Sequence, residues 1–135
     1  MRALLYRLAP YSTLVLRIGL AVVLLWFGTS ELIDAASWTS YAPSWAHSLG
    51  FMSAEQMVIM NGIFELVVGA CLLAGFCLRW AAGLLFLHFF PILFSVGYNE
   101  IGMRDFGLHM AALSLFLSGD DRFSVDCYLR TKRWR

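Results

Sequence analysis

The stretch MVIMNGIFELVVGACLLAGFCL, residues 57–78, determines the fold class of this chain. It is 22 residues long and carries one formal charge, Glu65, near its middle. At about 1.5 Å per residue, such a helix reaches roughly 33 Å, enough to cross a bilayer core of about 30 Å. An acid at that depth is costly and usually faces a bundle interior, a cavity or a partner. We therefore predict a central transmembrane helix whose Glu65 side points inward.

Small and polar residues share that side of the predicted helix. Asn61, Gly62 and Gly69 all fall on it at helical spacing. Small residues in this position allow the backbones of neighbouring helices to come close. The Glu65 side is therefore expected to pack against other helices.

The composition extends this interpretation to the whole chain. It is 60% hydrophobic and 14% charged, with a mean hydropathy of +0.70, whereas a soluble domain averages about 45–50% apolar and about 25% charged residues. Residues 1–135 are expected to form a single membrane domain, because four spans leave little chain for anything else. The net charge of +1 gives no reason to expect nucleic acid. The three cysteines lack the spacing of a metal site, so no metal is expected.

Four apolar segments predict an all-α, integral-membrane four-helix bundle. Ser53 and Gln56 match a capping box at the start of the second helix, and Pro91 is expected to kink the third. An interfacial loop, 34–55, and a polar surface tail, 119–135, complete the chain. The predicted helices cover about residues 11–32, 57–78, 79–96 and 103–118.

The basic residues indicate the orientation of the bundle. Eight lie in the N-terminal lead, the turn between the second and third helices, and the tail, whereas the other two loops hold only Arg104. By the positive-inside tendency, both termini are predicted to be cytoplasmic. The loop 34–55 is then outside. It contains Trp45 and other aromatic residues, and it is the expected contact for a partner.

Four ionisable residues are predicted within the bundle. Counted along the predicted helices from the cytoplasmic side, Arg17 lies roughly 9 Å deep, His88 and His109 roughly 13–14 Å, and Glu65 roughly 20 Å. Arg104 and Asp105 lie at the outer mouth, where Asp105 suits the N-terminal dipole of the fourth helix. Docking of a partner at the Arg104–Asp105 pair is the alternative interpretation.

These residues leave three interpretations open. The two histidines, His88 and His109, could face each other and bind a haem or a metal, although two histidines on separate helices are a weak signal. Glu65, His88 and His109 could line a pocket for a quinone ring. The polar groups could instead form structural hydrogen bonds and ion pairs, such as Arg17–Glu65.

Four sequence features carry a resemblance to a known family. They are RIGLAVVLLWFGTSEL at 17–32, ELVVGACLLAGF at 65–76, the Arg104–Asp105 pair, and GDDRFSVD at 119–126. In this order they resemble the DoxX-like family of small four-helix membrane proteins. Glu31 departs from the pattern, because family members often carry Lys at that place.

The resemblance carries specific positions over to this chain. They are Arg17, Glu65, Arg104 and Asp105. His88 and His109 are not part of the motif, so their assignment to the site is based only on their estimated depth in the membrane. The resemblance also implies residence in the bacterial cytoplasmic membrane, among relatives that look like subunits of quinol-oxidising complexes or proteins linked to quinone, thiol and oxidative-stress responses.

We therefore predict a small membrane subunit or accessory protein of a quinone-linked redox complex. A quinone is the cofactor considered, with Arg17 holding Glu65 ionised or oriented. The expected partners are the lipid bilayer, other subunits of the complex or a second copy of the chain. The alternative is a non-catalytic assembly, stability or oxidative-stress interaction protein. The sequence has no nucleotide loop and no nucleophile–base pair, so it is not expected to be an enzyme alone.

Overall fold

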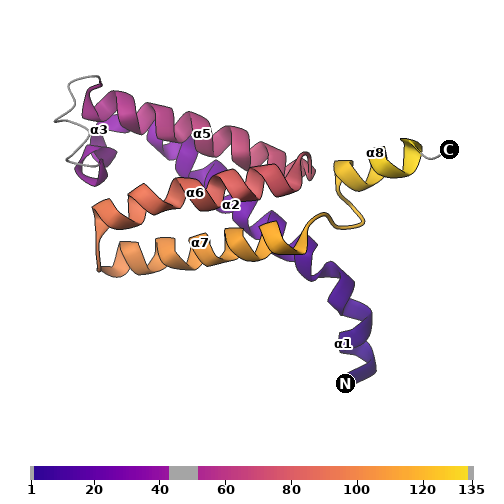
Figure 1. The fold of residues 1–135 in the computed structure, drawn as a ribbon. Coiled ribbons are helices and arrows are strands. Elements are labelled where there is room, and N and C mark those ends of the chain that lie inside the picture. Colours follow the sequence, from indigo (N-terminus) through magenta and orange to yellow (C-terminus); the bar gives the residue numbers. More distant parts are fainter. Residues whose placement is uncertain (1, 43–51, 134–135) are drawn as a thin grey trace.

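A computed structural model of the chain describes residues 2–42 and 52–133. All the regular secondary structure of these residues is helical, which confirms the all-α prediction. In Figure 1 the long helices pack together, and the N- and C-terminal segments lie at the same end of the bundle. The elements are α1 (Arg2–Leu8), η1 (Ala9–Tyr11), α2 (Ser12–Ile33), α3 (Ala35–Trp38), η2 (Thr39–Tyr41), α5 (Ala54–Ala74), α6 (Leu78–Val96), α7 (Glu100–Ser118) and α8 (Val125–Arg133).

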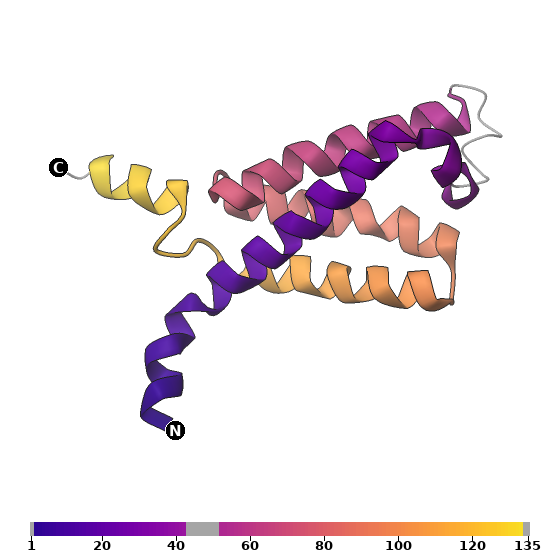
Figure 2. The same cartoon turned by 180° about the vertical axis from the view of Figure 1, so that it is seen from behind.

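The long helices have the length and composition of membrane spans. In the described part of the chain, three stretches are long and apolar enough to cross a bilayer: Leu4–Ile33, Ala54–Ala74 and Leu78–Val96. At 19 residues, α7 is as long as α6, but three of its first six residues are charged. It lies beside α6 and runs in the opposite direction (Figures 1 and 2). The chain is therefore a helical membrane protein.

A capping box sets the position at which α5 begins. Ser53 Oγ accepts a hydrogen bond from the Gln56 N–H at 3.2 Å, and Gln56 Oε1 accepts one from the Ser53 N–H at 2.9 Å. This reciprocal pair confirms the predicted capping box. Gly75 ends the helix in a left-handed conformation, with φ of 69°, that glycine adopts without strain. The helix begins at Ala54, three residues before the expected range.

Glycine brings α2 and α5 into close contact. A Cβ added to Gly28 would lie 2.7 Å from the carbonyl oxygen of Gly62, and one added to Gly62 would lie 3.0 Å from that of Gly28. A Cβ added to Gly69 would lie 3.1–3.2 Å from side-chain atoms of Leu24 and Leu25. The predicted packing role of Gly62 and Gly69 is confirmed. The buried core consists mostly of leucine and alanine side chains from all four long helices.

The C-terminal segment packs onto the end of the bundle where the termini lie. It was expected to be a polar surface tail, yet Asp121 is 6% exposed and Ser124 is 2% exposed. Asp126 accepts hydrogen bonds from the backbone N–H groups of Cys77 and Leu78 at 2.9 and 2.7 Å, which caps the start of α6. Beyond this contact, α8 points away from the bundle, as α1 does on the other side (Figures 1 and 2).

Candidate functional site

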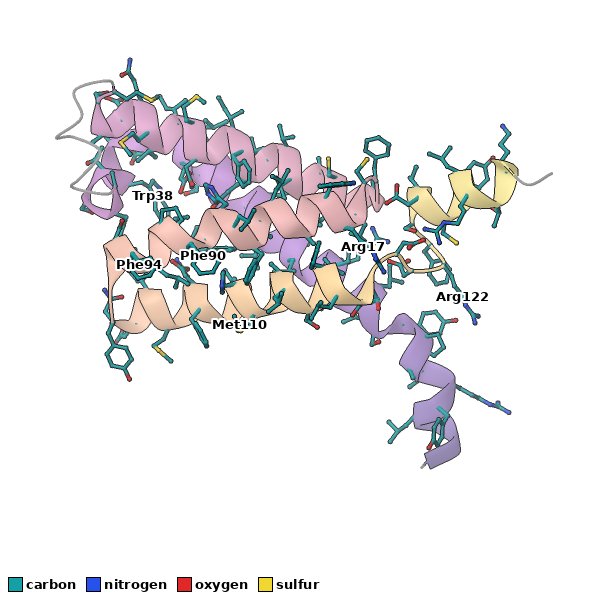
Figure 3. All side chains as sticks on the ribbon, viewed as in Figure 1. Arg17, Trp38, Phe90, Phe94, Met110 and Arg122 are labelled. Carbon is teal, nitrogen blue, oxygen red and sulfur yellow. The ribbon has the colours of Figure 1, made fainter. Side chains whose placement is uncertain are left out.

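A cavity of about 510 Å³ lies between the four long helices, at the end of the bundle opposite the termini. Its walls are mostly apolar and aromatic, with Phe27 from α2, Trp38 from α3, Phe64 from α5 and Phe89 from α6. Figure 3 labels Trp38 at this end. The volume falls within the range of roughly 300–1,000 Å³ that is usual for small-molecule sites.

Asn61 is the centre of a polar cluster in this cavity. Its amide nitrogen donates to both carboxylate oxygens of Glu31, at 2.9 and 2.8 Å, and to Glu65 Oε1 at 3.3 Å. His88 Nε2 lies 2.7 Å from Asn61 Oδ1, so the network assigns the proton of the imidazole to Nε2. One amide therefore links two carboxyl groups and a histidine from three different helices.

Glu65 retains a carboxyl oxygen that no other described residue binds. The residue is 7% exposed. Its Oε2 is buried and has no hydrogen-bond partner among the described residues. Buried polar atoms normally find a partner, and each exception needs an explanation. Because Glu65 lines the cavity, Oε2 is a position that a bound molecule can satisfy.

A second polar pair lines the same cavity from α7. Arg104 Nε donates to Asp105 Oδ1 at 2.8 Å, and Nη2 lies 2.7 Å from the same oxygen. The guanidinium carbon lies 4.5 Å from the centre of the Phe27 ring, a cation–π contact that ties α7 to α2. The Arg104 side chain is 43% exposed, whereas that of Asp105 is 6% exposed. The cavity therefore has a partly exposed cation that can still form further hydrogen bonds.

Arg17 lies far from this cavity, and its suggested pairing with Glu65 is wrong. Its Nε donates to Asp121 Oδ2 at 2.8 Å, and its Nη1 donates to the carbonyl groups of Leu72 and Leu73 at 2.7 Å each. Leu72 follows Glu65 by seven residues, or roughly 10 Å along α5. Figure 3 labels Arg17 near the opposite end of the bundle from Trp38. The residue therefore cannot orient Glu65 directly.

His109 is separated from His88 by its aromatic surroundings. The His109 ring stacks on Phe86 at 4.2 Å and meets the edge of Phe90 at 4.7 Å, whereas His88 stacks on Phe64 at 4.1 Å. His88 lines the cavity and His109 does not, as far as the described residues define it. In residues 2–42 and 52–133, no group of three or more His, Cys, Asp or Glu is placed to hold a metal. The facing-histidine geometry that a haem requires is not formed.

Comparison with known proteins gives the family. A family model described as DoxX matches residues 12–98, which include α2, α5 and α6. The chain belongs to the DoxX family. No curated protein and no solved structure matched it. The matched region contains Glu65 and the cluster around Asn61, but it ends before the Arg104–Asp105 pair.

Two cavity residues of this DoxX protein were not assigned to a site from its sequence. Asn61 precedes Glu65 by four residues, so helical spacing alone places both on one face, and that signal was available. Glu31 reaches Asn61 because α2 and α5 approach closely at Gly28 and Gly62, which no local pattern predicts.

Trp45, the expected partner contact of the DoxX chain, lies outside the described residues.

Proposed function

We propose that this DoxX protein is a small membrane subunit or accessory protein of a quinone-linked redox complex, and that the cavity holds a quinone ring. One observation carries the proposal: Glu65 Oε2 is buried beside a mostly apolar and aromatic cavity, and no residue in 2–42 or 52–133 forms a hydrogen bond with it. A quinone ring is planar and apolar except for two carbonyl oxygens. It therefore suits flat aromatic walls with a few polar groups that set its orientation.

The polar groups of the cavity match both ends of such a ring. Glu65 can donate a hydrogen bond when protonated and accept one when ionised, so it can meet a ring oxygen in the oxidised or the reduced state. Arg104 retains donors beyond those that contact Asp105 and can meet the other oxygen. In this proposal Asn61 and His88 act as positioning residues, because Asn61 contacts Glu65 and His88 contacts Asn61.

The ligand is tested on the purified protein in lipid nanodiscs. A short-chain ubiquinone and a short-chain menaquinone are titrated separately while tryptophan fluorescence is recorded, since Trp38 lines the cavity. We expect saturable quenching by at least one of them. Glu65→Gln should weaken binding about tenfold or more, because a hydrogen bond to a charged group contributes about 1.5–3 kcal/mol. Asn61→Leu should weaken binding less, because Asn61 positions Glu65 and does not contact the ring.

The matched control is Glu55→Gln, which removes an exposed acid from the first turn of the same helix. It should bind both quinones as the unmodified protein does. Linear quenching that does not saturate would rule out the cavity as a quinone site. An equal loss of quinone affinity in the Glu55→Gln control would do the same.

The role as a subunit needs a separate experiment. The tagged protein is extracted from its native membrane in mild detergent, and the proteins and quinones that remain bound are identified by mass spectrometry. Oxidoreductase subunits should co-purify, and Glu65→Gln and His88→Ala should lower quinol turnover of the parent complex. Recovery of the chain alone, or as a homo-oligomer with bulk lipid, would favour a stand-alone interaction or stability protein instead.

A further inference from the structure

A second cavity, of about 550 Å³, lies at the end of the molecule where the termini are. It is a groove between the start of α6 and the C-terminal segment. Two of its residues, Arg79 and Trp80, lie in the first turn of α6, and Leu129 and Arg130 belong to α8. Cys77, Asp120 and Asp126 complete its lining. It shares no residue with the cavity of Glu65.

The acidic groups of this groove already have partners. Asp120 pairs with Arg130 at 2.8 Å, and Asp126 is occupied by the backbone N–H groups that it caps at the start of α6. Arg79, by contrast, forms no ion pair within the part of the chain that the structure describes. Among the described residues, the groove therefore has one cation, Arg79, that is not used in an ion pair.

Gly119 leaves room for the Arg79 guanidinium. A Cβ added to Gly119 would lie 2.8 Å from both Nε and Nη2 of Arg79, so the guanidinium lies directly against the glycine backbone. The exposed Arg79 side chain therefore lies along this backbone at the groove. Trp80 follows it in sequence and is 77% exposed.

We propose that this groove binds the phosphate headgroup of an anionic phospholipid. The start of a helix long enough to span the bilayer lies at headgroup level, where tryptophan is favoured. Arg79 would contact the phosphate, Trp80 would lie at the interface, and Leu129 would contact the beginning of an acyl chain. The N–H groups of Cys77 and Leu78 at the start of α6 are already bound by Asp126, so the proposed contact is made by the Arg79 side chain.

The charge of the surrounding surface favours this occupant. Among the described residues, eight of the nine Lys and Arg lie at this end of the molecule, against three of the nine Asp and Glu. Basic residues next to a span are attracted to anionic lipids. The end as a whole therefore attracts anionic lipid, while Arg79 and Trp80 give the groove a specific place for one headgroup.

The test uses the full chain with Trp80 retained and the other four tryptophans replaced by Phe. It is reconstituted in vesicles of phosphatidylcholine that contain increasing fractions of brominated phosphatidylglycerol or of brominated phosphatidylcholine. Brominated phosphatidylglycerol should quench Trp80 at a lower mole fraction, by about fivefold for one basic contact. Arg79→Gln should abolish the difference. Arg122→Gln, the same charge change at an exposed position outside the groove, should preserve it (Figure 3).

Three outcomes would overturn the proposal. The first is equal quenching by the two lipids, and the second is an equal loss of the phosphatidylglycerol preference in Arg79→Gln and Arg122→Gln. The third is relief of quenching by inorganic phosphate, which would indicate that the groove binds a soluble anion instead. Where the tryptophan replacements prevent folding, native mass spectrometry of the chain with all its tryptophans replaces the optical measurement. In mixed lipid–detergent micelles, that chain should retain phosphatidylglycerol over phosphatidylcholine, and Arg79→Gln should not; equal retention would contradict the site.

Discussion

Arg17 forms hydrogen bonds through all three nitrogens of its guanidinium inside the protein. Nε and Nη2 face the carboxylate of Asp121, and Nη1 donates to two carbonyl groups near the end of α5. The side chains of Arg17 and Asp121 are only 2% and 1% exposed. Removing one partner of such a buried pair leaves the other as an uncompensated charge, at a cost of about 3–5 kcal/mol.

We expect Arg17→Met to lower the free energy of unfolding by about 3–5 kcal/mol. Arg17→Lys should also destabilise, because an ammonium group lacks the planar fork that reaches the carboxylate and both carbonyl groups. Unfolding in detergent, followed by a steric trap or by heating, measures both. Asp120→Asn is the control: its partner Arg130 is 63% exposed, so it should cost at most about 1 kcal/mol. Equal losses at the two sites would contradict the assignment of Arg17 as a buried anchor.

At the scale of elements, the contact between α2 and α5 decides whether the cavity exists. Gly28 and Gly62 let the two backbones touch, and the same approach brings Glu31 of α2 to Asn61 of α5. In a membrane, helices associate by packing and polar contacts, since lipid chains are as apolar as leucine. A single methyl group at this crossing therefore affects the packing and the polar cluster together.

Gly28→Ala should separate α2 from α5 and lower the thermal stability in detergent. It should also weaken the binding of any ligand that depends on the Asn61 cluster. Gly19→Ala lies on the same helix, where an added Cβ meets nothing within 4 Å. It should be neutral or stabilising by up to about 1 kcal/mol, because alanine favours a helix over glycine. Melting curves of the two variants, with distances between spin labels on α2 and α5, measure the difference. A Gly28→Ala protein as stable as Gly19→Ala, with unchanged distances, would contradict this role.

At the scale of the whole molecule, the sequence predicts the features that depend on neighbouring residues. Hydrophobic length predicted long helices, and the Ser53 cap and the packing glycines of α5 were predicted from spacing. Which polar groups meet depends instead on how helices rotate and where the tail folds. Arg17 therefore pairs with Asp121, 104 residues further along the chain, and not with Glu65 as suggested from the sequence. The depth counted along the predicted helices put His88 and His109 at the same level in the membrane. It could not show that the His109 ring packs on phenylalanine rings of α6.

The charge distribution of the whole molecule predicts its orientation, with both termini in the cytoplasm. Cys77 is exposed at that end. With the other two cysteines replaced by Ser, a membrane-impermeant maleimide should label it in inverted vesicles but not in intact spheroplasts. A Cys introduced for the exposed Ser40, at the opposite end and with Cys77 also replaced, should show the reverse. The opposite labelling pattern would show that the predicted orientation is wrong and that both termini lie outside.

The pairing of Arg17 with Asp121 also has a consequence for how the protein is made. At about 5–20 residues per second, the ribosome needs on the order of 5–20 s to reach Asp121 after it has made Arg17. During that interval the first helix must enter the membrane with its guanidinium unmatched. A chain whose translation stops early never receives the matching carboxylate and keeps a charge that the bilayer penalises. Only a copy translated through residue 121 can form this ion pair, so truncated products should be less stable and preferred targets for membrane proteases.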